Sequence, residues 1–543
     1  MRITSNTIIR AALAAASGVA LALAFPKFDL NLLAWVAFVP LFYAIDGLTP
    51  GVAFAYGWVQ GLACYIVSVY WITITLNSFA HLPIAVAVLP MLLLSAILAI
   101  YTGAAVWAGV YCSTRTRIPF VIAFPIIWAG IEWLRSFFPI GFPWSYVGYA
   151  EYRNLELIQF AEITGVYGVS ALVVFFNAVL YSVVFGRHSR RVQTISLGTL
   201  TALMVAALAF GAVRIHHFDH APARGKLRVA MVQGDIPQSI KWDPAFLRSS
   251  FEVYLKQSKI AAHENVDLIV WPEAAAAFLF QPTDDYPAQL IEDAQYRTRL
   301  LAAARAGGTP ILFGAPAYGF QDGQPVFYNR AYLVSAQGRV ANYYDKMQLV
   351  PFGEYVPLRA VLGYFVQKVA KGFGDMIPGR VQTIFDVKGA RLGVLICYES
   401  VFPDLTRRAV KHGAEILVNI TNDAWYGDSS APYQMLAMAA MRSVETKVPM
   451  IRVANTGISA IILPAGQIVA PTPLFRRTSE VEEVAYRPER TIYTIVGDLF
   501  AEICFGLTIA ALLFAWLRPT PPQTLETSTI ASAAGMIGIN GSG

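Results

Sequence analysis

Three segments in the second half of the sequence each lead to a side chain that suits acyl-transfer chemistry. The run 266–271 is followed by Pro272 and Glu273, the run 392–396 is followed by Cys397, and Lys346 follows a Tyr-Tyr-Asp segment. Short β-branched and aliphatic runs are typical of strands. Because catalytic side chains on α/β scaffolds collect just past the carboxyl ends of strands, we expect these three to meet.

A glutamate, a lysine and a cysteine together form a chemically complete set. A thiol is a good nucleophile only as the thiolate, which a nearby base or cation favours. Glu273 could accept the thiol proton, Lys346 could stabilise the thiolate and a tetrahedral oxyanion, and the backbone N–H of Tyr398 could face that oxyanion. We therefore expect neither a metal nor a cofactor.

Each segment alone also has an ordinary structural explanation. Glu273 could be a solvated residue that ends a strand, and Cys397 could be a core cysteine. Lys346 and Glu354 surround a Pro/Gly turn and could form a surface ion pair. The aromatic residues around that pair argue against full exposure, because they would partly bury both charges and buried charges need partners.

The composition is that of a membrane protein with a soluble insert. Of the 543 residues, 56% are hydrophobic and 14% are charged, against about 25% charged in an average soluble domain. The net charge is +6, but the basic residues lie mostly in short loops beside apolar spans, so no nucleic-acid partner is expected. Of the four cysteines, only Cys397 belongs to the soluble part, where a lone thiol suggests catalysis.

Apolar segments predict about eight membrane-spanning helices, each long enough or nearly so to cross about 30 Å of hydrocarbon. Their expected bounds are 8–25, 31–46, 52–75, 83–111, 118–135, 163–186, 194–213 and 499–517. If these spans alternate, one side of the membrane receives the basic residues Arg2, Arg10, Arg115, Arg117, Arg187, Arg190, Arg191 and Arg518. Because positive loops stay inside, both termini are expected in the cytoplasm and the large insert outside it.

This pattern divides the chain into four parts. Residues 1–215 should form a transmembrane bundle of about seven helices, and 499–517 a C-terminal transmembrane helix. Between them, 220–495 should form an extracytoplasmic α/β domain, because β-branched runs alternate there with helical patterns. The segment 518–543 is rich in Thr, Pro, Ser, Ala and Gly and is expected to be a disordered tail.

The order of the motifs resembles a known family. Trp-Pro-Glu at 271–273, Tyr-Asp-Lys at 344–346 and Cys-Tyr-Glu at 397–399 are similar to the nitrilase superfamily. Within it, the extended motif to Pro357, together with flanking membrane spans, resembles the bacterial apolipoprotein N-acyltransferase family. Further matching segments are 232–238, 419–425, 452–457, Glu132-Trp133-Leu134-Arg135 and Gly141-Phe142-Pro143-Trp144. The resemblance extends to about residue 517.

The resemblance implies an αββα nitrilase-like sandwich and a ping-pong transfer in the bacterial inner membrane, with the catalytic domain on the periplasmic side. Cys397 would take an acyl chain from a phospholipid, typically phosphatidylethanolamine, as a thioester. The acceptor would be the amine of the S-diacylglyceryl cysteine of an apolipoprotein. Glu273 would act as general base, Glu354 would orient Lys346, and Glu399 would support the site beside the nucleophile.

Several residues are candidates for contact with lipid. The segment 358–379 combines an apolar-aromatic stretch with lysines and glycines, so we expect a mobile lipid-gating arm that includes Phe365 and Phe373. A fixed core helix with a loop explains that segment equally well. Trp242 and Trp144 are similar candidates by resemblance, and each could instead be an interfacial anchor.

Two other functions fit parts of the sequence. A membrane-tethered amidase or nitrilase acting on small amides would use the same three residues, but eight spans exceed what a tether needs. A transporter with an external ligand-binding domain would carry ionisable residues along its path through the membrane. The ionisable residues near the spans, Glu132, Arg135 and Glu502, all lie close to span ends, which argues against transport.

Overall fold

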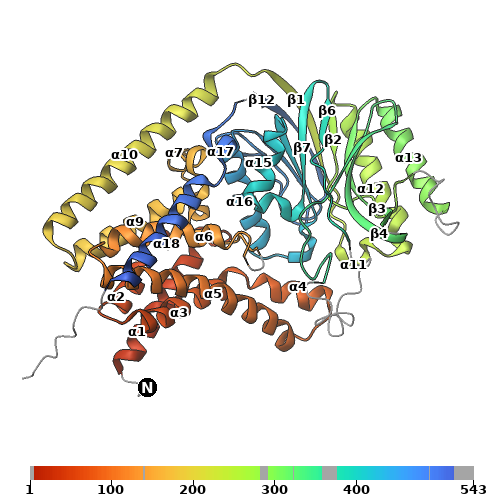
Figure 1. Ribbon diagram of the computed structural model, residues 1–543. Coiled ribbons are helices and arrows are strands. Elements are labelled where there is room, and N and C mark those ends of the chain that lie inside the picture. Colours follow the sequence, from red (N-terminus) through yellow and green to blue (C-terminus); the bar gives the residue numbers. More distant parts are fainter. Residues whose placement is uncertain are drawn as a thin grey trace, which may run out of the picture.

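The computed structural model describes residues 5–138, 141–281, 291–321, 323–356, 376–487 and 489–518. Figure 1 shows a group of helices from the N-terminal half beside a two-sheet domain, with the final helix α18 (Leu499–Leu517) running back among those helices. The long helix α10 (Arg190–His220) leads from the bundle to the domain, whose first strand begins at Gly225.

Six helices of the described residues are long and apolar enough to cross a membrane. They are α1 (Ser5–Leu23), α3 (Pro50–Ser68), α5 (Ile84–Arg115), α9 (Val166–Val184), α10 and α18. The bundle also contains shorter elements: η1 (Asn31–Trp35), α2 (Val39–Ile45), α4 (Trp71–Phe79), α6 (Phe120–Leu134), η2 (Val147–Glu151), α7 (Leu155–Ile158) and α8 (Ala161–Thr164). The polytopic helical bundle predicted from the sequence is confirmed.

The expected count of about eight spans is approximate for a structural reason. The spans expected over 31–46 and 118–135 are both shorter than a full crossing helix. The first is divided into η1 and α2, with Pro40 in the first turn of α2. The second is α6, whose 15 residues extend only about 22 Å at 1.5 Å per residue. The span expected over 52–75 ends at Ser68, and α4 begins a new helix at Trp71.

Small residues allow the central membrane helices to pack closely. A Cβ atom added at Gly57 of α3 would lie 2.8 Å from the side chain of Val106 in α5. One added at Gly61 would lie 2.9 Å from the Cα atom of Ala99. Contacts this short leave no room for a side chain, so α3 and α5 depend on glycine here, as is common between membrane helices.

The domain between α10 and α18 contains two six-stranded sheets, with strand orders β12-β1-β2-β3-β4-β5 and β11-β10-β9-β8-β7-β6. The strands are β1 (Gly225–Gln233), β2 (Leu268–Val270), β3 (Ile311–Gln321), β4 (Gln324–Val334), β5 (Val340–Asp345), β6 (Ile384–Val387), β7 (Ala390–Ile396), β8 (Ile416–Thr421), β9 (Met450–Ala454), β10 (Ala460–Ile462), β11 (Ile468–Val469) and β12 (Thr478–Tyr486). The helical elements are α11 (Gln238–Lys241), α12 (Pro244–Ala262), α13 (Ile291–Gly307), η5 (Cys397–Val401), α15 (Pro403–Lys411), η6 (Asp423–Tyr426), α16 (Ala431–Thr446) and α17 (Ile492–Val496).

Alternating side chains divide the domain into layers. In β1, Val229 belongs to the same hydrophobic cluster as Val394 of β7, whereas its neighbour Ala230 packs with Phe251 of α12. In β7, the residue after Val394 is Leu395, which belongs to the cluster that lies under α15 and α16. Successive residues of a strand face opposite sides of a sheet, so the two sheets share an inner core and carry helices on their outer faces. Figure 1 shows α12 and α13 on the side away from the bundle, and α15 and α16 on the side toward it. The expected αββα sandwich is confirmed.

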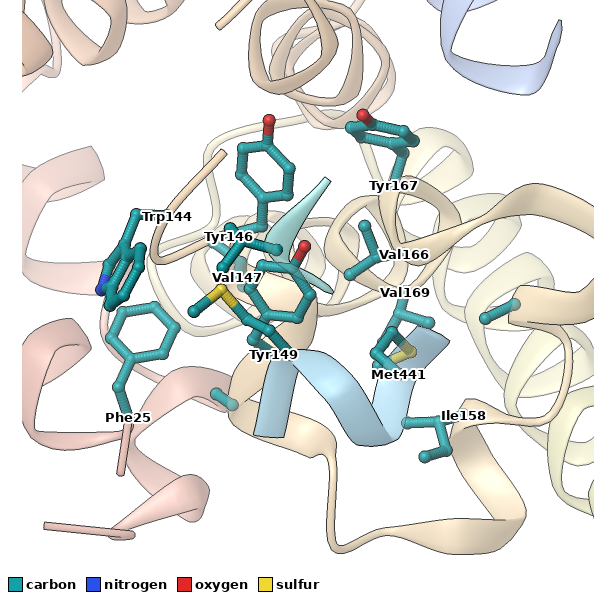
Figure 2. Close-up of a cluster of buried hydrophobic side chains, with 14 of the residues drawn as sticks. Phe25, Trp144, Tyr146, Val147, Tyr149, Ile158, Val166, Tyr167, Val169 and Met441 are labelled. Atoms are coloured by element: carbon teal, nitrogen blue, oxygen red, sulfur yellow. The ribbon is translucent and has the colours of Figure 1, made fainter. Parts of the chain in front are cut away.

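The domain is joined to the bundle by a buried interface. Figure 2 shows Met441 of α16 among bundle side chains that include Tyr149 and Ile158. Beside it, the Glu445 carboxylate accepts a 2.9 Å hydrogen bond from the backbone N–H of Val166, the first residue of α9. A negative charge at a helix N-terminus is electrostatically favourable. The position of the domain on the bundle is therefore set by packing and by charge.

Candidate active site

Strand ends deliver the three side chains that the sequence singles out. Glu273 follows β2 in the first sheet, Lys346 directly follows β5 of the same sheet, and Cys397 directly follows β7 of the second sheet. The pairing of β2, β3, β4 and β5 makes β5 run in the same direction as β2, so both carboxyl ends lie at one edge. Glu273, Lys346 and Cys397 are respectively 6%, 1% and 4% exposed.

Lys346 lies between two carboxylates. Its Nζ atom is 3.2 Å from Oε1 of Glu273 and 3.0 Å from Oε1 of Glu354. Burial alone would lower the pKa of Lys346, but the two negative charges raise that pKa above its ordinary value. The lysine is therefore a permanent ammonium, and the alternative of a surface Lys–Glu pair is wrong because both partners are enclosed.

Asn329 of β4 connects the same two carboxylates. Its Nδ2 atom donates hydrogen bonds of 2.7 Å to Glu273 Oε1 and 2.8 Å to Glu354 Oε1. The second oxygen of Glu273 accepts a 2.9 Å bond from the backbone N–H of Asn422. Burial alone would raise the pKa of Glu273, but the charge of Lys346 and the bond from Asn329 hold it below its ordinary value of 4.5.

Cys397 begins η5 in a strained backbone conformation, with φ of +53°. Such values are uncommon outside glycine and often mark functional sites. The thiol of Cys397 and the carboxylate of Glu273 interact electrostatically, and each shifts the pKa of the other. Burial, and then the charge of Glu273, raises the pKa of the thiol. At neutral pH the site therefore holds a neutral thiol beside an ionised carboxylate that can receive its proton.

Glu399 joins the two strand ends that carry Lys346 and Cys397. One carboxylate oxygen accepts bonds from the Tyr344 hydroxyl at 2.9 Å and from the N–H groups of Met347 and Gln348 at 2.6 and 3.1 Å. The other oxygen accepts the Ile396 N–H at 2.7 Å. Burial raises the pKa of Glu399 to about 7. None of these bonds involves the thiol of Cys397. The contacts of Glu399 instead link the end of β5 in one sheet to the end of β7 in the other.

The aromatic candidates occupy two different environments. Trp144 is 1% exposed; its indole is stacked 6.4 Å from the ring of Tyr398 and donates a 2.7 Å hydrogen bond to Gln434. Trp242 is half-buried and follows α11. Most of the expected arm 358–379, with Phe365 and Phe373, lies outside the described residues, as does the expected tail beyond Arg518.

Sequence reasoning missed three polar residues that contact Glu273. Asn329 is the amide within an aromatic strand segment, Phe-Tyr-Asn-Arg, and this position was the available signal. Asn422 belongs to the segment 419–425, which was noted only as a whole, and Lys241 directly precedes the candidate Trp242. Lys241 donates a 2.9 Å bond to the backbone carbonyl of Glu273. Within the described ranges, no three His, Cys, Asp or Glu side chains gather as a metal site would require.

Comparisons with known proteins identify two matching families and several similar proteins. Residues 228–486 match the carbon-nitrogen hydrolase family, and residues 17–179 match the family described as apolipoprotein N-acyltransferase N-terminal domain. The apolipoprotein N-acyltransferase of Geobacter metallireducens is 41% identical over 92% of this chain and 95% of its own length. That of Methylococcus capsulatus is 32% identical over 93% and 96%. Among solved structures, an amidase from Nesterenkonia sp. AN1 aligns with a TM-score of 0.37 at 19% identity, over 51% of this chain and 98% of the amidase.

Proposed function

The chain belongs to the apolipoprotein N-acyltransferase family, and from this premise we propose that Cys397 carries the acyl group between two lipid substrates as a thioester. The chain is a bacterial inner-membrane N-acyltransferase that acts on lipid and lipoprotein substrates. The proposal for its mechanism rests on one observation: the ionised Glu273, the ammonium of Lys346 and the thiol of Cys397 meet in one buried cluster.

In the first half-reaction the donor is a phospholipid, which we take to be phosphatidylethanolamine. Glu273 accepts the thiol proton as the Cys397 sulfur attacks the ester carbonyl. The ammonium of Lys346 and the backbone N–H of Tyr398 hold the oxyanion. The ester C–O bond then breaks, and the leaving lysophospholipid oxygen takes the proton from Glu273.

In the second half-reaction the nucleophile is the neutral α-amine of the diacylglyceryl cysteine of an apolipoprotein. The amine attacks the thioester and gives a proton to Glu273. The C–S bond breaks, the sulfur recovers that proton, and an amide remains. Through both steps Glu354 keeps Lys346 in place by their 3.0 Å ion pair, and Glu399 keeps the two strand ends together.

Burial supports transfer over hydrolysis. All three side chains are less than a tenth exposed. A thioester in a site that excludes water is protected from hydrolysis until the amine arrives. Extraction of an acyl chain into water would cost about 0.8 kcal/mol per CH₂ group. A site that adjoins membrane helices through Tyr398 and Trp144 avoids most of that cost, since the chain need not cross water.

The mechanism is tested by intact-protein mass spectrometry after incubation of the purified enzyme with phosphatidylethanolamine alone. We expect a hydroxylamine-labile gain of one acyl chain and release of lysophospholipid. Cys397→Ala is the matched control and should gain nothing. A folded wild-type enzyme that forms no adduct and releases no lysophospholipid would contradict the proposal.

We also propose that the catalytic domain is periplasmic and both termini are cytoplasmic. The support is the distribution of charge. Arg10 donates a 2.7 Å bond to the carbonyl of Ala44, and Arg187 pairs with the nearby Asp46, so the basic loops gather at one end. At the other end Lys27 pairs with Asp428 of the catalytic domain at 2.7 Å. Positive loops remain in the cytoplasm.

The orientation is tested with single introduced cysteines, because the four native ones are buried. A membrane-impermeant thiol reagent on intact cells, with the outer membrane permeabilised, should label Gln337→Cys, in the exposed turn after β4. It should label Arg190→Cys, at the start of α10, only after lysis. The reverse pattern would refute the orientation.

A further inference from the structure

Lys241 is a second buried ammonium beside the catalytic centre. It is the last residue of α11 and is 2% exposed. Its Nζ atom donates a 2.9 Å hydrogen bond to the backbone carbonyl of Glu273. No carboxylate of a described residue forms a direct ion pair with it. Burying a charge without an ion-pair partner costs free energy. The presence of a buried lysine at this position therefore needs an explanation.

The helix α11 contacts both the backbone and, through Asn422, the side chain of Glu273. Lys241 binds the backbone carbonyl of Glu273. Gln238, one turn earlier, accepts a 2.7 Å bond from the Asn422 side chain, and the Asn422 N–H in turn donates to Glu273 Oε2 at 2.9 Å. A short helix of four residues thus contacts the general base directly at its backbone and through Asn422 at its carboxylate.

The charges around Glu273 balance only when Lys241 is counted. Its carboxylate faces Lys346, which follows β5, and shares that lysine with Glu354. Lys241 of α11 and the Cys397 thiol of η5 also interact electrostatically with this carboxylate. The charge of Asp423 in η6 acts on it as well, but Asp423 is paired with Arg452 of β9 at 2.9 Å. Without Lys241, two carboxylates would share one ammonium.

We propose that Lys241 is a positioning residue that holds Glu273 at the end of β2 and keeps its carboxylate ionised while Lys346 turns toward the reacting oxygen. This inference rests on the proposed function, in which Glu273 is the general base. In that mechanism the ammonium of Lys346 donates hydrogen bonds to two groups, because the oxyanion that forms competes with Glu273 for the N–H groups of Lys346. Lys241 is bound to a carbonyl that takes no part in the chemistry. Burial lowers the pKa of Lys241 to about 8, so the residue keeps its charge at the acid pH values where the protonation of Glu273 is tested.

Removal of that charge should change the pH dependence of acylation. An opposite charge nearby lowers the pKa of a carboxyl group by about one unit or more, so its loss raises the pKa of Glu273. Acylation needs Glu273 ionised, so the rate of acylation falls at low pH as Glu273 takes a proton. This fall, the acid limb of the pH profile, therefore moves to higher pH. We expect a shift of about one pH unit, which makes acylation about tenfold slower at a pH below both midpoints.

The test measures acylation of Cys397 by phosphatidylethanolamine from pH 3 to 8 in the full-length enzyme, because the pKa of Glu273 in the wild type lies below 4.5. Lys241→Met removes the charge and the hydrogen bond, whereas Lys241→Gln removes the charge and keeps a donor. Both should show the shifted acid limb with an unchanged half-saturating phospholipid concentration. Lys241→Arg keeps the charge and should retain the wild-type acid limb. Lys447→Met, which removes a buried lysine at the end of α16, is the matched control and should not move it.

The outcomes separate the two proposals. A wild-type enzyme that never forms the adduct would overturn the proposed function. A wild-type enzyme that forms it, with Lys241→Gln and Lys241→Met folded and their acid limbs superimposable on it, would overturn the role of Lys241 alone. If Lys447→Met moved the limb as far as Lys241→Met, the effect would be a general one of lost buried charge, and the inference would also fail.

Discussion

Replacement of Asn329 by aspartate tests whether the carboxylate pair is organised as the contacts indicate. The change replaces one NH₂ group by an oxygen and leaves the size of the side chain nearly constant. The amide now donates to Glu273 at 2.7 Å and to Glu354 at 2.8 Å. Asn329→Asp would present a third carboxylate to these two oxygens, in a position that is 8% exposed.

The size of the effect follows from the two lost bonds. A hydrogen bond to a charged group contributes about 1.5–3 kcal/mol, so the lower figure for both bonds gives about 3 kcal/mol. At about 1.36 kcal/mol per factor of ten, acylation of Cys397 should fall at least about 100-fold at pH 8. Repulsion among three carboxylates raises their pKa values. The loss should therefore shrink as the pH falls toward 5.5, where one of the three takes a proton and can donate again.

The assay is the rate of thioester formation from phosphatidylethanolamine at pH 8 and pH 5.5. Asn342→Asp makes the same chemical change on β5 of the same sheet, where the side chain is outside the cluster, and should leave the rate within about twofold of wild type. The reasoning is refuted if Asn329→Asp acylates within threefold of wild type at pH 8. It is refuted equally if a folded variant shows the same deficit at both pH values.

Two further predictions concern Glu399 and the pH range of the wild-type enzyme. The Ile396 N–H now donates a 2.7 Å hydrogen bond to Glu399. In Glu399→Gln it should face an NH₂ group instead, and loss of the bond should cost about 2 kcal/mol of local stability. We expect hydrogen exchange in the peptide that carries Ile396 to rise about thirtyfold, with Glu483→Gln on β12 as the silent control; unchanged exchange would contradict the bracing role. Because the pKa of Glu273 is held below 4.5, its ionised form adds stability above that value, which is lost as the pH falls through the folded-state pKa. Wild-type acylation should thus show no inflection from Glu273 between pH 5 and 8, and a half-loss near pH 6 would argue against this assignment.

Features that depend on local runs of residues could be predicted from the sequence. The apolar spans and the α/β insert follow from hydropathy and periodicity, which each segment carries independently of its partners. The positions of Glu273 and Cys397 after strands also follow, since the apolar run and the residue that ends it are adjacent. The expected bounds were less accurate where local breaks such as Pro40 or the junction at Ser68 divide a hydrophobic stretch.

Contacts between distant segments could not be predicted. Asn329 meets Glu273 only because β4 and β2 lie on either side of β3 in the sheet, with one particular register. Trp144 suits a membrane interface by its type, yet the tertiary structure encloses it beneath Tyr398. In each case the partner is set by strand order or by the docking of the domain on the bundle, which no short pattern specifies.

By itself, the sequence determined the membrane bundle, the α/β insert and the three residue types that suit acyl transfer, because hydrophobicity and side-chain chemistry belong to each segment alone. Only the tertiary structure decided which charges balance. It placed Lys346 between two carboxylates, joined those carboxylates through Asn329, and set Lys241 against the backbone of Glu273. The physical reason is that electrostatic energy depends on distances between groups and on the burial around them, and both arise only when the two sheets and the bundle are assembled.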